Sequence, residues 1–382
     1  MHETETISLP TGSPGTHRQL TVHRWGSSGA RPKVYIQAGL HADELPGVLA
    51  ACHLIPLLDQ AARDCQIVGE VILVPTANPI GMAQSLHGRH HGRFAFADGF
   101  GNFNRGWPDL GGMILGGDSD KLGNDPGRNI KIVRAALLKA VAALPDLSEV
   151  EALRKALLSL SIDADFVFDL HCDAQALLHL FANHEHEDLI VELGQDMGAR
   201  VILLETSVDA GLFDECNGGP WIKLRRALGL SPAALPAACF APTVGLRGQS
   251  DVSAELGAQD AAGIIRFLRR RGMIRGPVAT LPDALCQPSP IAACDMVYAP
   301  CAGMVIWHKP VGSSVACDDH LADIVDLSAP DPLFACTPVH AAQTGVLFSH
   351  RTGYLTRPGE ILGQIAGTAP LSRRHGVEFL NP

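Results

Sequence analysis

The chain has 382 residues, of which 46% are hydrophobic and 18% are charged, a composition that indicates a folded protein with a large core rather than a disordered one. Its formal net charge of -10 disfavours binding to nucleic acid or to an anionic membrane, although a local cluster of arginines can still hold an acidic substrate. No apolar run long enough to cross a membrane and no signal peptide are evident, and the ten cysteines form no CxxC pair. We therefore expect a cytoplasmic protein with reduced thiols.

Strand and helix patterns alternate along the first two thirds of the chain. Short apolar runs predict strands at 33–40, 70–75, 165–170, 201–204 and 238–246, and helical spacing predicts helices at 44–58, 187–197 and 257–271. This alternation favours an α/β fold with a mostly parallel or mixed sheet and helices on both faces. Ligands bind such sheets at the carboxyl ends of the strands. The segment 87–127, with weak periodicity, predicts a long functional loop.

The pattern changes after Gly276. Residues 277–290 are proline-rich, and from 291 to 382 short β-type segments alternate with glycine and proline. The sequence thus predicts a domain of residues 1–276, a linker of residues 277–290, and a small all-β domain of residues 291–382. A biotinyl- or lipoyl-type carrier role for the last region is disfavoured, because its only lysine, Lys309, precedes a proline.

Three candidate metal ligands follow two of the predicted strands. His41 and Glu44 lie where a strand gives way to a helix, and His171 ends another apolar strand. Catalytic zinc takes three such N and O ligands, and these three share one edge of the expected sheet. The alternative is that Glu44 complements a helix dipole and that His171 is an ordinary hydrogen-bonded histidine. Either Asp169 or Asp173 is expected to orient His171 through its second ring nitrogen.

The long loop contains candidate substrate ligands. Asn104 and Arg105 together offer an amide and a planar guanidinium that match a carboxylate. Arg93 can add a positive charge that polarises a carbonyl or stabilises an oxyanion. Taken alone, loop arginines are more often solvated surface residues.

Four short motifs occur in order along the chain. They are G-x-H-x-D-E-x-P-G at 39–47, N-P-x-G at 78–81, N-x-N-R-x-W-P at 102–108 and D-L-H-x-D at 169–173. This combination resembles the succinylglutamate desuccinylase/aspartoacylase family, a branch of the zinc carboxypeptidase-like hydrolases, over about residues 30–272. The β-rich tail also resembles the barrel-sandwich domain appended to longer bacterial members.

The resemblance carries expectations for single residues. It implies one zinc ion held by His41, Glu44 and His171. It also implies that Asn104 and Arg105 bind the carboxylate of the substrate and that Arg93 assists at the carbonyl.

One position departs from the family pattern. The family's general base is a glutamate in a context such as T-V-E-L-R-G-Q, and this chain reads TVGLRGQ at 243–249, with Gly245 at the glutamate position. Three explanations are open: Glu255 or Glu205 supplies the carboxylate, the chain is a natural member with lost or altered activity, or the glycine was engineered. The last two are favoured over a shifted base.

Restoring the carboxylate by Gly245→Glu is expected to raise turnover by orders of magnitude. Strand alternation places Arg247 on the same face as Gly245, toward the substrate.

The sequence therefore predicts a zinc-dependent amidohydrolase, a deacylase, that cleaves an N-acyl amide of a small amino acid or related carboxylate. Its activity is lowered if no other group replaces the glutamate. The alternatives are a metallocarboxypeptidase that acts on short peptides and a non-catalytic zinc-containing binding protein. The expected partner is a small N-acyl amino acid-like molecule, with no nucleic acid and no membrane, and a homo-oligomer stays open.

Overall fold

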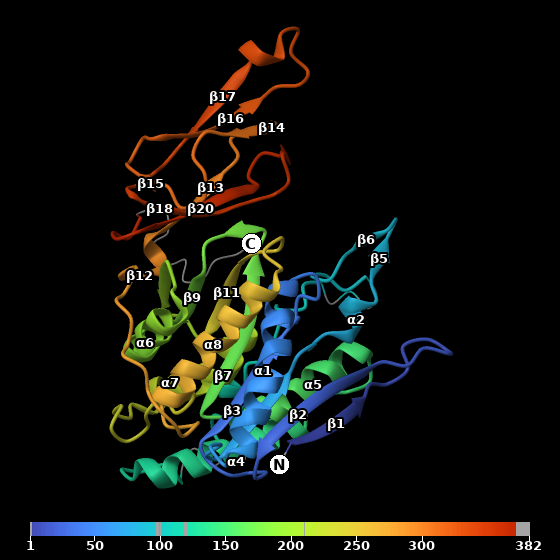
Figure 1. The fold of residues 1–382 in the computed structure, drawn as a ribbon, viewed down its shortest axis with the longest axis vertical. Coiled ribbons are helices and arrows are strands. Elements are labelled where there is room, and N and C mark those ends of the chain that lie inside the picture. The colour runs from blue at the N-terminus through green and yellow to red at the C-terminus, as the bar shows by residue number, and fades with distance from the viewer. Residues whose placement is uncertain (1, 97–98, 100, 118–120, 210, 372–382) are drawn as a thin grey trace.

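The computed structural model describes residues 2–96, 99, 101–117, 121–209 and 211–371. Its largest element is a nine-stranded mixed sheet in the order β1-β2-β4-β3-β7-β11-β9-β10-β12 (Figure 1). The strands are β1 (His2–Ser8), β2 (Gln19–Gly26), β3 (Lys33–Ala38), β4 (Glu70–Val74), β7 (Phe166–Asp173), β9 (His179–Asn183), β10 (Val201–Glu205), β11 (Thr243–Gly248) and β12 (Pro288–Pro290).

The centre of this sheet is parallel, from β4 through β3 and β7 to β11. The N-terminal hairpin β1–β2 joins it antiparallel through β4, and β9 also lies antiparallel to β11. The predicted α/β fold with a mixed sheet is confirmed. The strands β1, β2 and β9 were not predicted: β1 is largely solvent-exposed, β2 is buried mainly at alternate positions, and β9 is a short strand antiparallel to β11.

Helices cover both faces of the sheet. They are α1 (Leu45–Arg63), α2 (Pro79–Met82), α3 (Leu110–Ile114), α4 (Pro126–Ala142), α5 (Glu149–Ser161), α6 (Glu187–Met197), α7 (Phe213–Leu228) and α8 (Ala254–Arg270). One apolar core joins α1, α6 and α8 to the sheet, and a second core joins α3, α4, α5 and α7 to it. Because both faces are covered, β3 and β4 are buried along their whole length, which explains their continuous apolar sequences.

By length and composition, α1 is apolar enough to cross a membrane. The same features are those of a helix in the core of a globular protein. Its residues Ala50, Ala51, Leu54 and Leu58 are buried in the core shared with α8 and the sheet. We therefore interpret α1 as a core helix.

The C-terminal region consists of two antiparallel sheets. One has the order β13-β20-β18-β15, with β8 paired to β18, and the other has the order β17-β16-β14-β19. The strands are β8 (Gln175–Ala176), β13 (Cys294–Tyr298), β14 (Gly303–Trp307), β15 (Ser314–Val315), β16 (His320–Val325), β17 (Cys336–His340), β18 (Gly345–His350), β19 (Leu355–Thr356) and β20 (Ile361–Gly367); a separate hairpin is formed by β5 (Ser85–Leu86) and β6 (Arg89–His90). These sheets enclose a small apolar core of their own, consistent with the predicted all-β region.

The two regions are joined by more than the connecting chain. Strand β8, which follows β7, pairs with β18, and the backbone N–H of Leu177 donates to the carbonyl oxygen of Phe348 at 2.9 Å. Part of the predicted linker is itself a strand, since β12 pairs with β10 at the edge of the large sheet. Figure 1 shows the C-terminal sheets beyond the end of the large sheet toward which β7 and β11 point. The domain boundaries at 276 and 290 stay predictions.

Candidate active site

Two adjacent parallel strands bring the three predicted ligands together. Ala38, the last residue of β3, lies in register with Leu170 of β7, so the segment after β3 meets the end of β7. Glu44 then caps the start of α1, with His41 three residues before it. The ligand atoms of His41, Glu44 and His171 lie within 4.8 Å of one another, and all three residues are buried.

The two imidazoles converge on one carboxylate. Nδ1 of His41 lies 2.8 Å from Oε1 of Glu44, and Nδ1 of His171 lies 2.9 Å from Oε2. Their opposite nitrogens have their own partners: Nε2 of His41 lies 2.8 Å from Oδ1 of Asn102, and Nε2 of His171 lies 2.9 Å from Oδ2 of Asp169. Since these oxygens accept hydrogen bonds, each Nε2 can carry the proton and leave Nδ1 free to bind a cation. This is the arrangement that metal-bound histidines usually have.

The charges around His171 also suit a cation. Burial opposes protonation of His171, but the negative charges of Asp169 and Glu44 outweigh burial and raise its pKa to about 10. Such a surplus of negative charge around a buried nitrogen is neutralised either by a proton or by a metal ion. The donor set of two imidazoles and one carboxylate is one that zinc accepts. Of the two aspartates expected to orient His171, the structure places Asp169 in this role.

A pocket of about 130 Å³, lined mostly by charged and polar residues, adjoins this group. The residues around it include all the predicted site residues except Arg247, together with several that were not predicted. The lining consists of His41, Glu44, Arg93, Asn104, Arg105, His171, Cys172, Asp173, His179, Phe181, Glu205, Leu212, Asp214, Thr243, Gly245 and Gln364.

The predicted substrate ligands lie on one wall. The guanidinium of Arg93 donates to Oε1 of Glu44 at 2.7 Å, which places a positive charge directly beside the ligand group. Oδ1 of Asn104 accepts from the backbone N–H of Phe213, so its amide is fixed, with Nδ2 3.3 Å from Nε2 of His171. Arg105 donates to the carbonyl oxygen of Asn104 and borders the pocket. Burial and the nearby Arg93 lower the pKa of Arg105, as expected for a partly desolvated cation with room for an anion.

Arg247 does not join these residues, and the reason is a local break in β11. The strand register shifts between Gly245 and Gly248, and Arg247 adopts a positive φ of 63°. Side-chain alternation therefore fails at this point. The guanidinium of Arg247 instead pairs with Asp260 of α8 at 2.5 Å.

The alternative carboxylates for the general base have different positions. Glu255 is exposed in the first turn of α8 and does not line the pocket. Glu205 does line it, and burial together with the charges of Asp214 and Glu215 raises its pKa. The positive charge of Arg105 acts in the opposite direction and lowers the pKa of Glu205.

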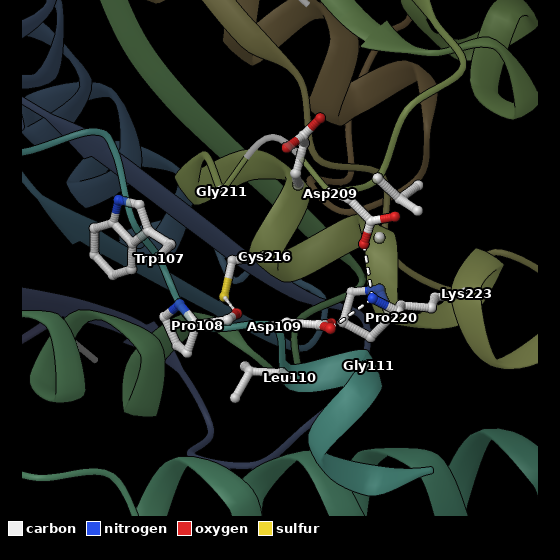
Figure 2. A pocket seen from close by; sticks show the side chains of 13 residues that line it. Trp107, Pro108, Asp109, Leu110, Gly111, Asp209, Gly211, Cys216, Pro220 and Lys223 are labelled. Atoms are coloured by element: carbon white, nitrogen blue, oxygen red, sulfur yellow. Dashed lines mark hydrogen bonds and ion pairs between the residues drawn. The ribbon is translucent and has the colours of Figure 1, made fainter. Parts of the chain in front are cut away.

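A second cavity of about 280 Å³ lies next to this pocket, between the segment 107–111 and α7 (Figure 2). There Nζ of Lys223 bridges Asp109 at 2.5 Å and Asp209 at 2.7 Å, and the Cys216 thiol donates to the carbonyl of Pro108. Since Lys223 is already paired with two carboxylates and the predicted catalytic groups line the other pocket, the second cavity is not the candidate active site.

The structure thus combines a mixed α/β sheet with a buried His-Glu-His group that could hold a metal ion, beside a pocket at the strand ends. Comparison with known proteins then points to one family. The profile described as succinylglutamate desuccinylase/aspartoacylase catalytic domain matches residues 30–112, which confirms the resemblance inferred from the motifs. No curated protein matches the sequence.

Solved structures share this fold over nearly the whole chain. A succinylglutamate desuccinylase/aspartoacylase family protein from Shewanella amazonensis SB2B is 25% identical, with a TM-score of 0.81 over 95% of this chain and 98% of that one. A protein from Shewanella frigidimarina described in the same terms is 22% identical, with a TM-score of 0.82 over 96% and 97%. The product-bound ectoine utilization protein EutE (DoeB) from Ruegeria pomeroyi is 17% identical, with a TM-score of 0.65 over 96% and 95%. The first two matches include the C-terminal sheets, so this region is part of the shared architecture.

Proposed function

We propose that this chain is a zinc-dependent amidohydrolase that removes an acyl group from the nitrogen of a small amino acid or a related carboxylate. The observation that carries the proposal is the buried His41–Glu44–His171 group beside a pocket with two arginines. A zinc ion held there would supply Lewis-acid chemistry to the amide carbonyl and to the attacking water.

The chain's own residues provide the remaining functions. Arg105 and Asn104 bind the substrate carboxylate and fix the amide against the ligand group, which lowers the entropic cost of reaction. Arg93, beside Glu44, stabilises negative charge that develops on the carbonyl oxygen. Asn102 and Asp169 hold the two imidazoles in orientation.

The lining of the pocket supports a small substrate over a peptide, because Gln364 of the C-terminal region forms part of it. A metallocarboxypeptidase limited to short peptides is the second candidate function. A non-catalytic zinc-containing binding protein is the third, and it depends on the base being absent.

A substrate panel with metal analysis tests this proposal. N-acetyl, N-succinyl and N-formyl derivatives of acidic, neutral and basic amino acids are compared with dipeptides and longer peptides, by detection of released amine. We expect hydrolysis of at least one acyl amino acid, abolished by a chelator and restored by zinc. Preferential hydrolysis of dipeptides would instead favour the carboxypeptidase, and tight binding without turnover of any compound would favour the binding protein.

We also propose a cytoplasmic location and a small-molecule partner. The acidic net charge and the reduced-thiol interpretation support this, and Cys172 and Cys239 are free and buried.

A further inference from the structure

The position of the missing glutamate is occupied by a side chain from the neighbouring strand. Strand β11 lies between β7 and β9, and Gly245 is in register with His171 on one side and with His179 on the other. Side chains at the same register position of adjacent strands point to the same face of a sheet. His171, Gly245 and His179 thus form one row that faces the pocket.

The imidazole of His179 fills the gap in that row. A Cβ atom added at Gly245 would lie 2.2 Å from Nε2 of His179 and 2.4 Å from its Cε1. Neither distance is compatible with a side chain at position 245 while the imidazole stays where it is. The glycine therefore makes room for the ring, and a side chain at position 245, as in Gly245→Glu, requires the imidazole to move.

The hydrogen bonds of His179 determine which nitrogen is available. Nδ1 lies 2.8 Å from the carbonyl oxygen of Leu177, and because a carbonyl only accepts, Nδ1 carries the proton. The neutral ring then has its lone pair on Nε2, the atom that lies over Gly245. Within the described parts of the chain, no hydrogen-bond partner is recorded for Nε2. Burial lowers the pKa of His179, which keeps the ring neutral near pH 7.

Aromatic side chains hold this ring in place. His179 packs edge-on against Phe181 with ring centroids 5.4 Å apart, and at the same centroid distance against Phe348 of the C-terminal region. Because Gly245 is in register with both His171 and His179, the ring lies one strand away from His171 in the row that lines the pocket. Two other carboxylates of the pocket already accept hydrogen bonds: Asp214 from Thr243, and Asp173 from the backbone N–H of Ala174 and from Gln364.

We propose that His179 is the general base and acid of this enzyme, acting through Nε2 in place of the family's glutamate. This inference rests on the proposed function. As the oxygen of water forms its bond to the carbonyl carbon, one water proton moves to Nε2. When the tetrahedral intermediate collapses, the C–N bond breaks and the imidazolium returns that proton to the leaving nitrogen. The remaining proton passes from the acid product to the amine, which gives a carboxylate and an ammonium ion.

The first test compares His179→Gln with His186→Gln on an acyl amino acid that the wild type hydrolyses. His186 is a matched control, since it is partly buried and bonded to a backbone carbonyl, that of Cys239, but lies outside the active pocket. We expect His179→Gln to lower kcat by about 10²–10⁴-fold, the usual contribution of general acid–base catalysis, with KM and zinc content nearly unchanged. His186→Gln should keep the wild-type kcat.

A double replacement exploits the geometry. Gly245→Glu alone should not raise kcat, because the imidazole blocks the new side chain. In the double variant His179→Ala/Gly245→Glu, loss of the imidazole leaves space for the new carboxylate. We expect the kcat of this double variant to be at least tenfold higher than that of His179→Ala. A gain from Gly245→Glu alone would overturn the inference.

A spectroscopic readout does not depend on turnover. Long-range ¹H–¹⁵N spectra of histidine-labelled protein, assigned by the His179→Gln variant, should show His179 protonated on Nδ1 and bare on Nε2 at neutral pH. Protonation on Nε2, or wild-type kcat in His179→Gln, would overturn the role of His179 and leave the amidohydrolase proposal intact. Absence of hydrolysis by the wild type on the whole panel would overturn both.

Discussion

Two regions of this molecule contain a pair of histidines bridged by one carboxylate. In the large domain, Glu44 links His41 and His171 at 2.8 and 2.9 Å. In the C-terminal region, Asp323 links His308 and His320, both at 2.8 Å. By donor identity and distance the two groups are nearly the same.

The surroundings of the two groups differ. The side chains of the first group are 1–9% exposed. Asn102 contacts the imidazole of His41, Asp169 contacts that of His171, and Arg93 pairs with the carboxylate of Glu44. In the second group His308 and His320 are 41% and 44% exposed, and only Asp323 fixes their ring nitrogens among the contacts described. Metal affinity and catalysis require ligands that are held in orientation before the metal arrives. We therefore propose that the buried group is the hydrolytic site and interpret the exposed one as a surface cluster.

Loss of the bridging carboxylate should have the largest effect. Glu44→Gln removes the negative charge of a buried carboxylate. This carboxylate contacts both imidazoles and accepts hydrogen bonds from the Arg93 guanidinium and the backbone N–H of Cys172. We expect loss of tight zinc binding and of hydrolysis, measured by elemental analysis and amine release. Asp323→Asn is the matched control and should change neither. Equal losses in the two variants would remove the distinction between the groups.

Weakening the support of one imidazole should have the next largest effect. Asp169→Asn keeps the shape of the residue that holds Nε2 of His171 but removes its charge. Loss of such an outer contact typically costs about 10–100-fold in metal affinity or activity. Competition with a fluorescent zinc chelator measures the change. Wild-type affinity in Asp169→Asn would show that burial alone orients His171.

Replacement of Arg105, the proposed ligand of the substrate carboxylate, should have a smaller effect that is limited to KM. Arg105→Lys keeps a positive charge in the pocket but loses the planar fork that pairs with a carboxylate. We expect KM to rise by about tenfold or more, equivalent to about 1.5–3 kcal/mol for a charge-assisted hydrogen bond, with zinc content unchanged. Steady-state kinetics on the preferred acyl amino acid measure it. Arg351→Lys, a half-exposed residue of the C-terminal region, should leave KM unchanged.

The smallest effect concerns a buried histidine near the surface cluster. Burial lowers the pKa of His350 from its usual value of 6.5 to about 4, and its ring stacks on Trp307 at 3.7 Å. The folded protein thus binds fewer protons than the unfolded chain between these pH values, so stability falls as the pH drops from 6.5 toward 4. His350→Phe keeps a stacked ring without a titrating group. Denaturant unfolding at pH 7 and pH 5 should show a smaller change in the free energy of unfolding in this variant than in the wild type. An equal change would show that another group takes up the proton on unfolding.

The sequence was sufficient to predict the site residues that lie at or near the ends of apolar strands. His41, Glu44 and His171 each stand at or just after the end of an apolar strand, and parallel pairing brings such ends together. The motif N-x-N-R contained Asn102, but its contact with His41 depends on how the long loop returns to the sheet. The predicted helix at 187–197 also agrees with α6.

The positions of His179 and Arg247 were not predicted correctly, because they depend on the antiparallel pairing of β9 and on the register shift in β11. His179 reaches the site because β9 runs against β11, which no spacing along the chain reveals. Gly245 was interpreted as a missing carboxylate, although the glycine makes room for this imidazole. Arg247 turns away because of the register shift and positive φ in β11, and strand alternation does not anticipate either one.

Zinc stoichiometry in three matched proteins tests whether the buried group is the metal site. The wild type, His171→Ala and His320→Ala are purified, equilibrated with zinc, freed of excess metal and analysed for zinc per chain. We expect one zinc ion per chain in the wild type and in His320→Ala, and none in His171→Ala. Zinc retained by His171→Ala but lost from His320→Ala would contradict the assignment of the metal site to the buried group.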